Sequence, residues 1–380
     1  MLSRWTAHGR GVPNLVVARR VINKMVAAAQ RFAEDETGEA MVGLVVPGTH
    51  TNGVPTLYVL DTISPDETAV RQMHTFQQGD ERQDELIWWL QENWRVHREH
   101  ERQTGNAPGK WDVPLRYLGD WHKQPGHMIQ PSSGDLMTAL DWIDDPDNGM
   151  DFLLAPIVTL DHYPTTLIGD ATVNFVTVPQ GDGLNARIDF WYIDRETRLF
   201  LPVTPAVYPD DQLPSLVAYP WHLLNEARFS EESARLTSGD RFATLVLWEA
   251  DDAPPLEICF LIARVGADRV LLVVTPWNYP HAAPWARVAP YVAIGENDDV
   301  YRIFEQLWQQ SEPVEPPEGW QWNDSMYLID FVRALEEKLG LAETKGGEAD
   351  QPPHEEASHE LGLGVQSSLP SNWLPVSYSP

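Results

Sequence analysis

Four side chains between residues 122 and 135 have the types and the spacing of a metal-dependent hydrolytic site. His122 is followed by Pro125, Ser132 and Asp135 at offsets of 3, 10 and 13 in the segment WHKQPGHMIQPSSGD. Imidazole and carboxylate groups are zinc ligands, and zinc held by three protein ligands lowers the pKa of its bound water to about 7. Side chains of these types could take part in amide hydrolysis by a zinc-activated water if the fold brings them together.

The residue two positions after His122 decides what such a site could do. Gln124 offers a neutral amide oxygen there, which is a much poorer zinc ligand than an imidazole. His127 lies three residues further on and could replace it only if the loop folds back. His122 and Asp135 are therefore candidate metal ligands, with Gln124 and His127 as weaker candidates for a further position.

Two predicted elements position these groups. The segment LRYLGDWH has the pattern of a strand that ends at His122, and LMTALDWI after Asp135 has the pattern of a helix. Ser132 or Ser133 could cap that helix. Because the histidine ends the strand and the aspartate begins the helix, the loop between them can return the carboxylate to the imidazole.

Together these residues resemble the metal signature of the JAB/MPN (JAMM) metalloprotease family, H-x-H-P-x6-S-x-x-D, with Gln124 in place of the second histidine. Upstream, the segment ETGEAMVG from Glu36 to Gly43 is similar to the family's E-T-x-G-x-L-x-G. The resemblance implies a zinc ion held by His122 and Asp135, with Gln124 as a weak or outer ligand and His127 as its possible substitute. It also implies a serine that supports the transition state and a glutamate as general base. These roles fall on Ser132 and Glu36, with Glu39 as the second candidate for the base.

Each of these residues also has a simpler explanation. Ser132 and Asp135 precede a helix and are of the types that cap helices. Glu36 and Glu39 lie in an acidic linker, where solvated charge is the default, and a single histidine is usually polar surface. A deaminase-like zinc hydrolase would need a P-C-x-x-C ligand pair, and the single cysteine, Cys259, excludes it.

The second half of the chain carries a different pattern. YPHAAPW, from Tyr279 to Trp285, matches the YPxxxP turn of the ubiquitin-conjugating (UBC) and RWD fold, and follows a predicted helix and three predicted strands. Two predicted helices close the unit, the last one after Trp320 and Trp322. A conjugating enzyme needs a reactive cysteine between the turn and Trp320, where none is present. Cys259 lies in an apolar strand pattern, where a thiol is inert, so the resemblance implies a binding module.

Composition excludes several partners and locations. The net charge is −29, from 27 basic and 56 acidic residues, and such a surface repels nucleic acid and anionic membrane while it could attract a basic protein. No run of about 18 apolar residues is present, and the N-terminus lacks the apolar core of a signal peptide. A single cysteine suits a reducing, cytoplasmic compartment.

These patterns predict an α+β protein of two domains. We place an N-terminal arm at 1–12, a JAB/MPN-like domain at 13–205, a UBC/RWD-like domain at 215–341 and an acidic, disordered tail at 342–380. Apolar periodicity predicts helices over 14–33, 81–101, 215–236, 297–310 and 324–340. It predicts strands over 41–46, 56–63, 187–193, 199–203, 242–249, 256–265 and 269–275, and one buried strand over FLLAPIVTL.

Two functions follow from the resemblance. In the first, the protein is a zinc-dependent isopeptidase or peptidase that acts on conjugates or precursors of a ubiquitin-like modifier, and the second domain holds the modifier or a conjugating partner. In the second, both domains are catalytically degenerate and form a scaffold that binds a ubiquitin-like protein or an activating or conjugating enzyme. Gln124 leaves this choice open.

Overall fold

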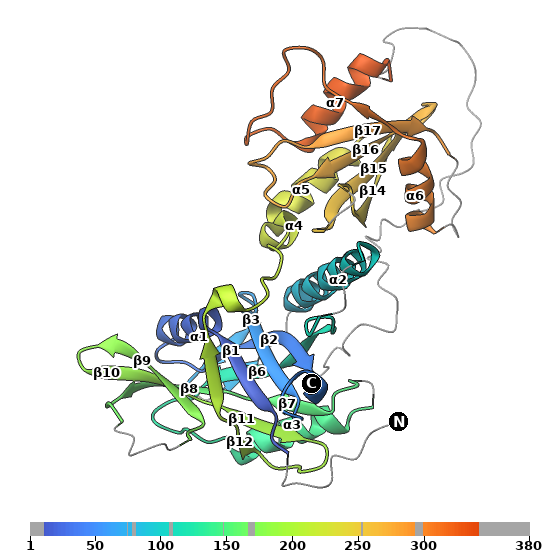
Figure 1. Cartoon of the computed structure of the whole chain (residues 1–380). Helices are drawn as coiled ribbons and strands as arrows, with labels where there is room; N and C mark the ends of the chain where they lie inside the picture. The colour runs from blue at the N-terminus through green and yellow to red at the C-terminus, as the bar shows by residue number, and fades with distance from the viewer. Residues whose placement is uncertain are drawn as a thin grey trace. The chain divides into compact units, whose positions relative to one another are not determined.

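A computed structural model describes residues 11–73, 75–77, 81–105, 109–146, 148–165, 172–251, 254–292 and 299–341. The chain divides into two compact units between Val217 and Ala218, and each combines helices with sheet (Figure 1). This confirms the predicted α+β class. The predicted arm over 1–12 lies outside the described residues except for its last two, and the predicted tail over 342–380 lies outside them entirely. No described helix is both long and apolar enough to cross a lipid bilayer.

In its described part, the first unit is built on an eight-stranded sheet with the order β13-β1-β3-β2-β6-β8-β10-β9. β1 runs parallel to β13 and β3, β6 runs parallel to β8, and the other neighbours are antiparallel. The strands are β1 (Asn14–Ala18), β2 (Thr37–Val46), β3 (Thr56–Ile63), β6 (Leu115–Lys123), β8 (Ile157–His162), β9 (Phe175–Gly181), β10 (Leu184–Asp189) and β13 (Pro205–Tyr208).

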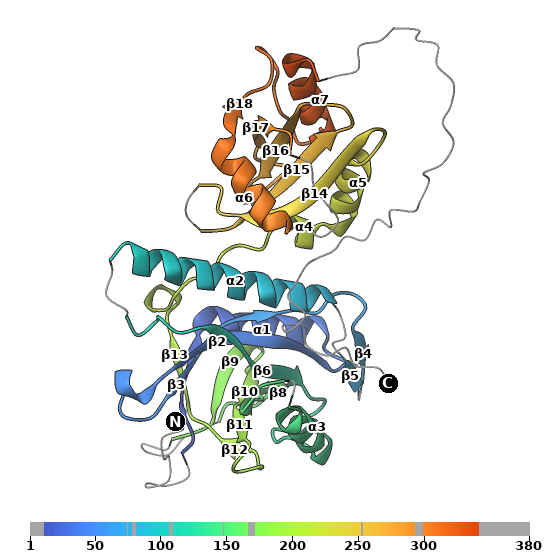
Figure 2. The same ribbon diagram turned by 90° about the vertical axis from the view of Figure 1, so that its right-hand side faces the viewer.

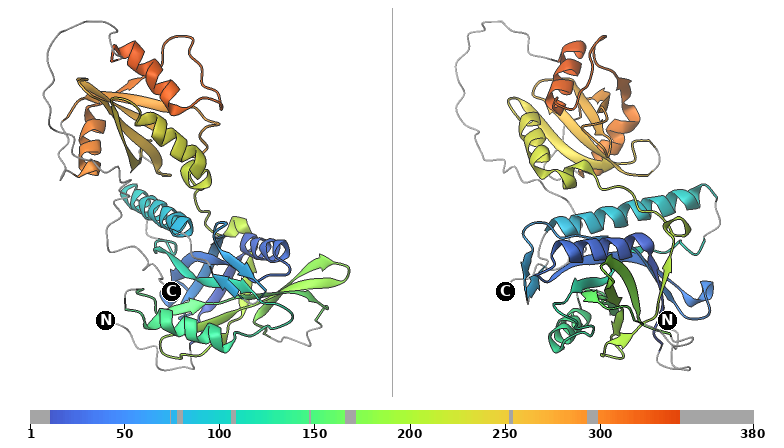
Figure 3. Two further views of the ribbon diagram at one scale, coloured as in Figure 1. Left: turned by 180° about the vertical axis from the view of Figure 1, so that it is seen from behind. Right: turned by 90° about the vertical axis from the view of Figure 1, so that its left-hand side faces the viewer.

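Two helices, α1 (Arg19–Arg31) and α2 (Glu81–Gln103), pack on opposite sides of the central strands (Figures 1 and 3). Nine of the ten residues of β2 are therefore buried, which explains why this strand is apolar on both faces. The smaller elements are β4 (Val70–Gln72), β5 (Thr75–Gln77), α3 (Ser133–Asp144), β7 (Phe152–Leu154), β11 (Trp191–Asp194), β12 (Leu201–Pro202) and the 3-10 turns η1 (Gly48–His50) and η2 (Asp210–Gln212).

Several limits in the first unit differ from the sequence prediction. The strand predicted over 187–193 is divided at Phe190 into β10 and β11, and the strand predicted over 41–46 already begins at Thr37. The helix predicted over 14–33 begins only at Arg19, because the apolar residues before it pair as β1 between β3 and β13. FLLAPIVTL forms two strands, β7 and β8, because Pro156 between them has no N–H to continue a ladder. The unit extends beyond 205, since β13 pairs with β1 and the Arg20 N–H donates to Asp210 Oδ1 at 2.9 Å.

The described part of the second unit contains a five-stranded antiparallel sheet in sequence order (Figure 2). Its strands are β14 (Arg241–Trp248), β15 (Glu257–Arg264), β16 (Arg269–Thr275), β17 (Trp285–Pro290) and β18 (Glu312–Val314). The first three confirm the predicted strands, whereas β17 was hidden by its proline-rich context. The helix predicted over 215–236 is divided into α4 (Trp221–Leu224) and α5 (Glu226–Leu236) by Asn225, whose side chain accepts a bond from the Arg228 N–H.

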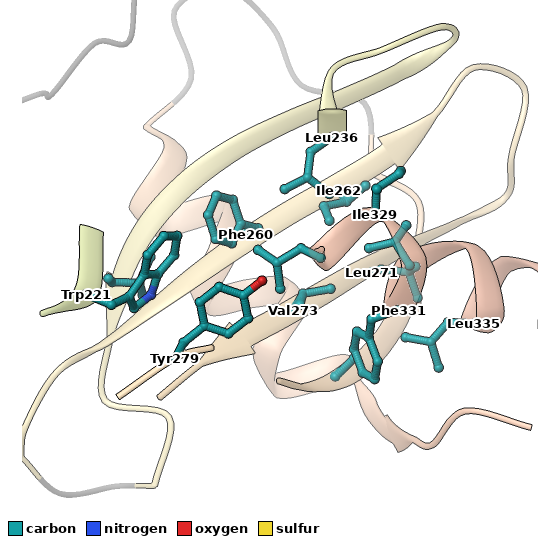
Figure 4. Packing of buried hydrophobic residues seen from close by; sticks show 14 residues of the cluster. Trp221, Leu236, Phe260, Ile262, Leu271, Val273, Tyr279, Ile329, Phe331 and Leu335 are labelled. Carbon is teal, nitrogen blue, oxygen red and sulfur yellow. The ribbon is translucent and has the colours of Figure 1, made fainter. Parts of the chain in front are cut away.

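Helices cover both faces of this sheet. α5 and α7 (Leu328–Leu339) pack on one face, over a cluster that includes Trp221, Tyr279 and Phe331 (Figure 4). α6 (Val300–Gln310) packs on the other face, over a second cluster that contains Cys259. Tyr279 of the predicted YP turn is buried, with its ring 4.8 Å from that of Trp221. Burial raises the pKa of the Cys259 thiol well above its usual range, as expected for an inert cysteine.

Candidate functional site

The end of β6 and the start of α3 bring three of the predicted site residues together. His122 Nε2 lies 3.1 Å from Gln124 Nε2 and 3.8 Å from Asp135 Oδ1. Gln124 Nε2 in turn donates to Asp135 Oδ2 at 3.3 Å. Gln124 follows directly after β6 and continues its alternation, so residues 122 and 124 lie on one face, and the Gln124 N–H donates to the Val158 carbonyl of β8 at 3.1 Å. The loop then returns Asp135 to that face, as the sequence predicted.

Ser132 and Asp135 also cap helix α3. The Ser132 hydroxyl accepts a bond from the Asp135 N–H at 3.2 Å, and the Asp135 carboxylate accepts one from the Ser132 N–H at 2.6 Å. This reciprocal pair satisfies two backbone donors at the helix start. The simpler explanation of these two residues as caps is therefore correct, and the same cap holds the Asp135 carboxylate beside His122.

Gln124 is the centre of the cluster. Its amide nitrogen contacts both the imidazole and the carboxylate, while its Oε1 is buried with no hydrogen-bond partner among the described residues. Burial lowers the pKa of His122, and the charge of Asp135 opposes that effect only in part. The imidazole is therefore neutral at pH 7, so its Nε2 can accept a hydrogen bond from the Gln124 amide.

The zinc site stays a prediction, because the cluster brings together only two side chains of the types that bind zinc well. Zinc sites in proteins use at least three nitrogen, sulfur or carboxylate ligands. No group of three or more histidine, cysteine, aspartate or glutamate side chains that could hold a metal occurs in the described part of the chain. The site offers one imidazole and one carboxylate, and the third group is an amide. His127 does not complete the set, since its ring packs against His162 with centroids 4.6 Å apart.

Glu39 is not part of this cluster. In the pairing of β2 with β6, Gly38 is opposite His122 and Glu39 is opposite Trp121. Because neighbours in a strand face opposite sides, Glu39 lies on the side away from His122. There its carboxyl group accepts bonds from the hydroxyls of Thr62, at 2.8 Å, and Ser64. Burial raises the pKa of Glu39, so this residue is a core carboxyl group.

Glu36 is the better placed of the two predicted bases. It directly precedes Thr37, the first residue of β2, and is half-buried. Alternation along the strand puts position 36 on the same side as Gly38, which is opposite His122. The Glu36 N–H donates to the Gln72 carbonyl of β4 at 2.9 Å, so the hairpin of β4 and β5 holds this segment.

Sequence reasoning missed Phe76, which borders the cluster. A Cβ atom built on Gly38 would lie 2.7 Å from Phe76 Cε1 and 2.3 Å from the Trp121 carbonyl oxygen. Only glycine therefore fits opposite His122, and the aromatic ring of β5 covers that position. Strands of three residues leave too weak a pattern to be predicted, but the glycine itself was a signal of close packing.

Comparisons with known proteins do not identify a family for this chain. No family model matches the chain, and no curated protein matches it. The solution structure of protein DSY2949 from Desulfitobacterium hafniense is similar at 14% sequence identity over 51% of this chain and 93% of that chain, with a TM-score of 0.28. So low a score supports no conclusion about fold or function.

Proposed function

We propose that this protein is a non-hydrolytic scaffold of a ubiquitin-like conjugation pathway, in which a JAB/MPN-like first unit and a UBC/RWD-like second unit bind a ubiquitin-like protein or a conjugation enzyme. The position of the Gln124 amide nitrogen carries the proposal, because it lies within hydrogen-bond reach of His122 Nε2 and Asp135 Oδ2. Its two N–H groups satisfy the imidazole and the carboxylate. A metal ion would have to replace both bonds and would gain only an amide as third ligand.

The second unit supports the same proposal independently. Thioester chemistry needs an accessible thiolate. Cys259 is the only cysteine of the chain, and it is buried in β15. We therefore assign this unit a binding role, with a preference for basic partner surfaces that follows from the net charge of −29.

Metal content tests the proposal. Full-length protein purified from zinc-supplemented medium is expected to hold far less than one zinc per chain by elemental analysis. Gln124→His is expected to raise this to about one per chain, because it supplies the missing imidazole. In that variant, Asp135→Asn should remove the zinc again. His127→Gln serves as the matched control and should change nothing, since its ring packs on His162.

The second candidate function is the zinc-dependent peptidase. The convergence of His122, Gln124 and Asp135, with Glu36 on the same side of β2, favours it over any unrelated chemistry. If each wild-type chain holds one zinc ion and Asp135→Asn removes it, the protein is this peptidase and the scaffold proposal is wrong. In that case Glu36→Gln should abolish cleavage of a ubiquitin-like fusion while zinc is retained. If Gln124→His binds no zinc, both candidates are wrong, because position 124 is then not a ligand position.

A further inference from the structure

The edge strands of the two large sheets differ in how they are protected against pairing. In the described part of the chain, β13 contains Pro205, β9 contains Pro179 and β18 contains Pro313. Proline has no N–H, and natural proteins use it to block further strand addition at an edge. The fourth edge, β14, has the sequence RFATLVLW without a proline.

β14 is also long, regular and apolar. Its register with β15 continues without a bulge from Arg241 opposite Arg264 to Trp248 opposite Glu257. Only Val246 is buried in β14, whereas five residues are buried in β15 and six in β16. The apolar side chains of β14 are therefore only partly covered, and Phe242 is 51% exposed. Such an edge is a template for strand addition.

The backbone groups available at this edge follow from the ladder. The Val265 N–H donates to the Asp240 carbonyl at 2.9 Å, so residues 240 and 265 form a hydrogen-bonded pair. Hydrogen-bonded and non-bonded pairs alternate in an antiparallel ladder. The N–H and C=O groups of Ala243, Leu245 and Leu247 therefore point to the outer edge, away from β15.

Near one end of this edge, the neighbouring strand β15 carries a carboxyl group with one oxygen that has no hydrogen-bond partner in the part of the chain that the structure describes. Glu257 is opposite Trp248, so the two side chains share one face of the sheet. Glu257 Oε2 is buried without a hydrogen-bond partner among the described residues. Burial raises the pKa of Glu257 to about 7, and the charge of Asp251 adds to this effect. A cation brought to this position would therefore gain a carboxylate that no described residue of the chain neutralises.

We propose that the outer edge of β14 binds an extended segment of a partner protein as an added antiparallel strand, and that this segment carries an arginine or lysine that lies over Trp248 and pairs with Glu257. The added strand would extend the existing meander, and its backbone would bond to the outward groups of Ala243, Leu245 and Leu247. Whether the first unit hydrolyses anything does not affect this binding.

The chemistry of the occupant follows from the charge and the geometry at this edge. A residue opposite Trp248 in an added strand would be two strand spacings from β15, or roughly 10 Å, which a long cationic side chain and a glutamate can bridge together. Its aliphatic stem and cationic head would cross the half-exposed Trp248 ring on the way. The net charge of −29 favours a basic segment over an acidic one and disfavours a second copy of this chain.

Labelled nonapeptides of alternating threonine and valine test the proposal by fluorescence anisotropy with the full chain. One peptide carries arginine in the second position, one carries it in the second-last position, and one has glutamine instead. The first peptide should bind tightest, because in an antiparallel strand its arginine falls beside Trp248. Replacing its arginine by glutamine should weaken binding about tenfold.

Two variants separate the backbone contribution from the charge. Ala243→Pro removes an outward N–H and should weaken all three peptides, while thermal unfolding checks that the unit still folds. Glu257→Gln should weaken the first peptide about tenfold and leave the glutamine peptide unchanged, which a double-mutant cycle measures. Glu312→Gln, an exposed carboxylate on β18, is the matched control and should leave every affinity unchanged.

Three results would overturn the proposal. The first would be that none of the peptides binds. The second would be that the first peptide binds equally well to the wild type, Ala243→Pro and Glu257→Gln. The third would be a dimer of the full chain in sedimentation velocity that Ala243→Pro dissociates, because a second copy of the chain would then occupy the edge.

Discussion

Each unit of this protein buries a side-chain oxygen that has no hydrogen-bond partner among the described residues, but the two groups differ in charge. Gln124 Oε1 belongs to a neutral amide whose nitrogen bonds to His122 and Asp135. Glu257 Oε2 belongs to a carboxyl group that can ionise, at the end of an open edge strand. The amide is held by groups of its own unit, whereas no cation among the described residues pairs with the carboxyl group.

The difference shows how one kind of defect can have two consequences. An unpaired amide oxygen costs a modest, fixed amount of stability at every pH. An unpaired carboxylate costs more, and the group avoids this by keeping its proton, which is why the pKa of Glu257 is raised to about 7. The Gln124 amide satisfies the polar groups of its own cluster, whereas the Glu257 carboxylate would be satisfied only by a cation from a partner. Exchanging the two groups tests this contrast.

The largest effect is expected from Gln124→Glu, which gives the first unit a buried acid. The substitution removes two donors and places a second carboxylate near Asp135 Oδ2, now 3.3 Å from the amide nitrogen. Two like charges at that distance cannot both ionise without cost. We expect a loss of about 3 kcal/mol in the free energy of unfolding at pH 7, measured by urea denaturation with a chelator present.

The pH dependence of this variant distinguishes repulsion from misfolding. The added carboxyl group should have a raised pKa, so its destabilisation should shrink as pH falls and the group is protonated. Gln130→Glu makes the same change at an exposed position of the same loop and should alter stability by no more than about 0.5 kcal/mol. A loss that is equal at pH 5 and pH 8 would contradict the interpretation.

Glu257→Gln makes the reverse exchange in the second unit and should stabilise it. The folded-state pKa of Glu257 is about 7 against a reference value of 4.5, so the unfolded chain releases the proton first. The free energy of unfolding of the wild type is therefore not reduced by this group below about pH 4.5, and it falls as the pH rises through 7 and the folded-state carboxyl group ionises. The variant cannot ionise and should be more stable by on the order of 2 kcal/mol at pH 8, after discounting for partial exposure.

Unfolding at two pH values checks the sign of this prediction. The variant and the wild type should unfold alike near pH 4.5, where the folded wild-type carboxyl group is also neutral. Glu312→Gln, on the exposed edge β18, supplies the control for removal of a charge from the same sheet. A variant that is less stable than the wild type at pH 8 would mean that Glu257 already has a cationic partner within the chain.

The exchanged groups also show what sequence can and cannot predict. The limits of the strand over 56–63 were predicted correctly, because turn-forming residues flank this run and β-branched and aromatic residues within it favour a strand. The meeting of His122 with Asp135 was also predictable, since a strand end and a helix start fixed their places. Apolar residues 14–18 fit a helix and a strand equally well, and only pairing with β3 and β13 decides between them.

Register and hydrogen-bond direction were beyond the sequence. Glu36 and Glu39 are three residues apart, and both were plausible bases until the pairing of Gly38 with His122 put Glu39 on the opposite side. The sequence predicts that Gln124 acts through its amide oxygen as a weak metal ligand. In the structure its nitrogen contacts His122 and Asp135, and the oxygen has no hydrogen-bond partner among the described residues. Such features depend on tertiary contacts that no local pattern encodes.

The smallest effect is expected from Asp135→Asn, which keeps the shape of the cap and removes only its charge. The charge of Asp135 raises the pKa of His122, against the larger lowering by burial. Its removal should therefore lower the pKa of His122 further, which a two-dimensional NMR titration of the imidazole can measure. The free energy of unfolding should change by less than about 1 kcal/mol, because the asparagine side chain can still accept the bond from the Ser132 N–H. A rise in this pKa would show that Asp135 does not act on His122 through its charge.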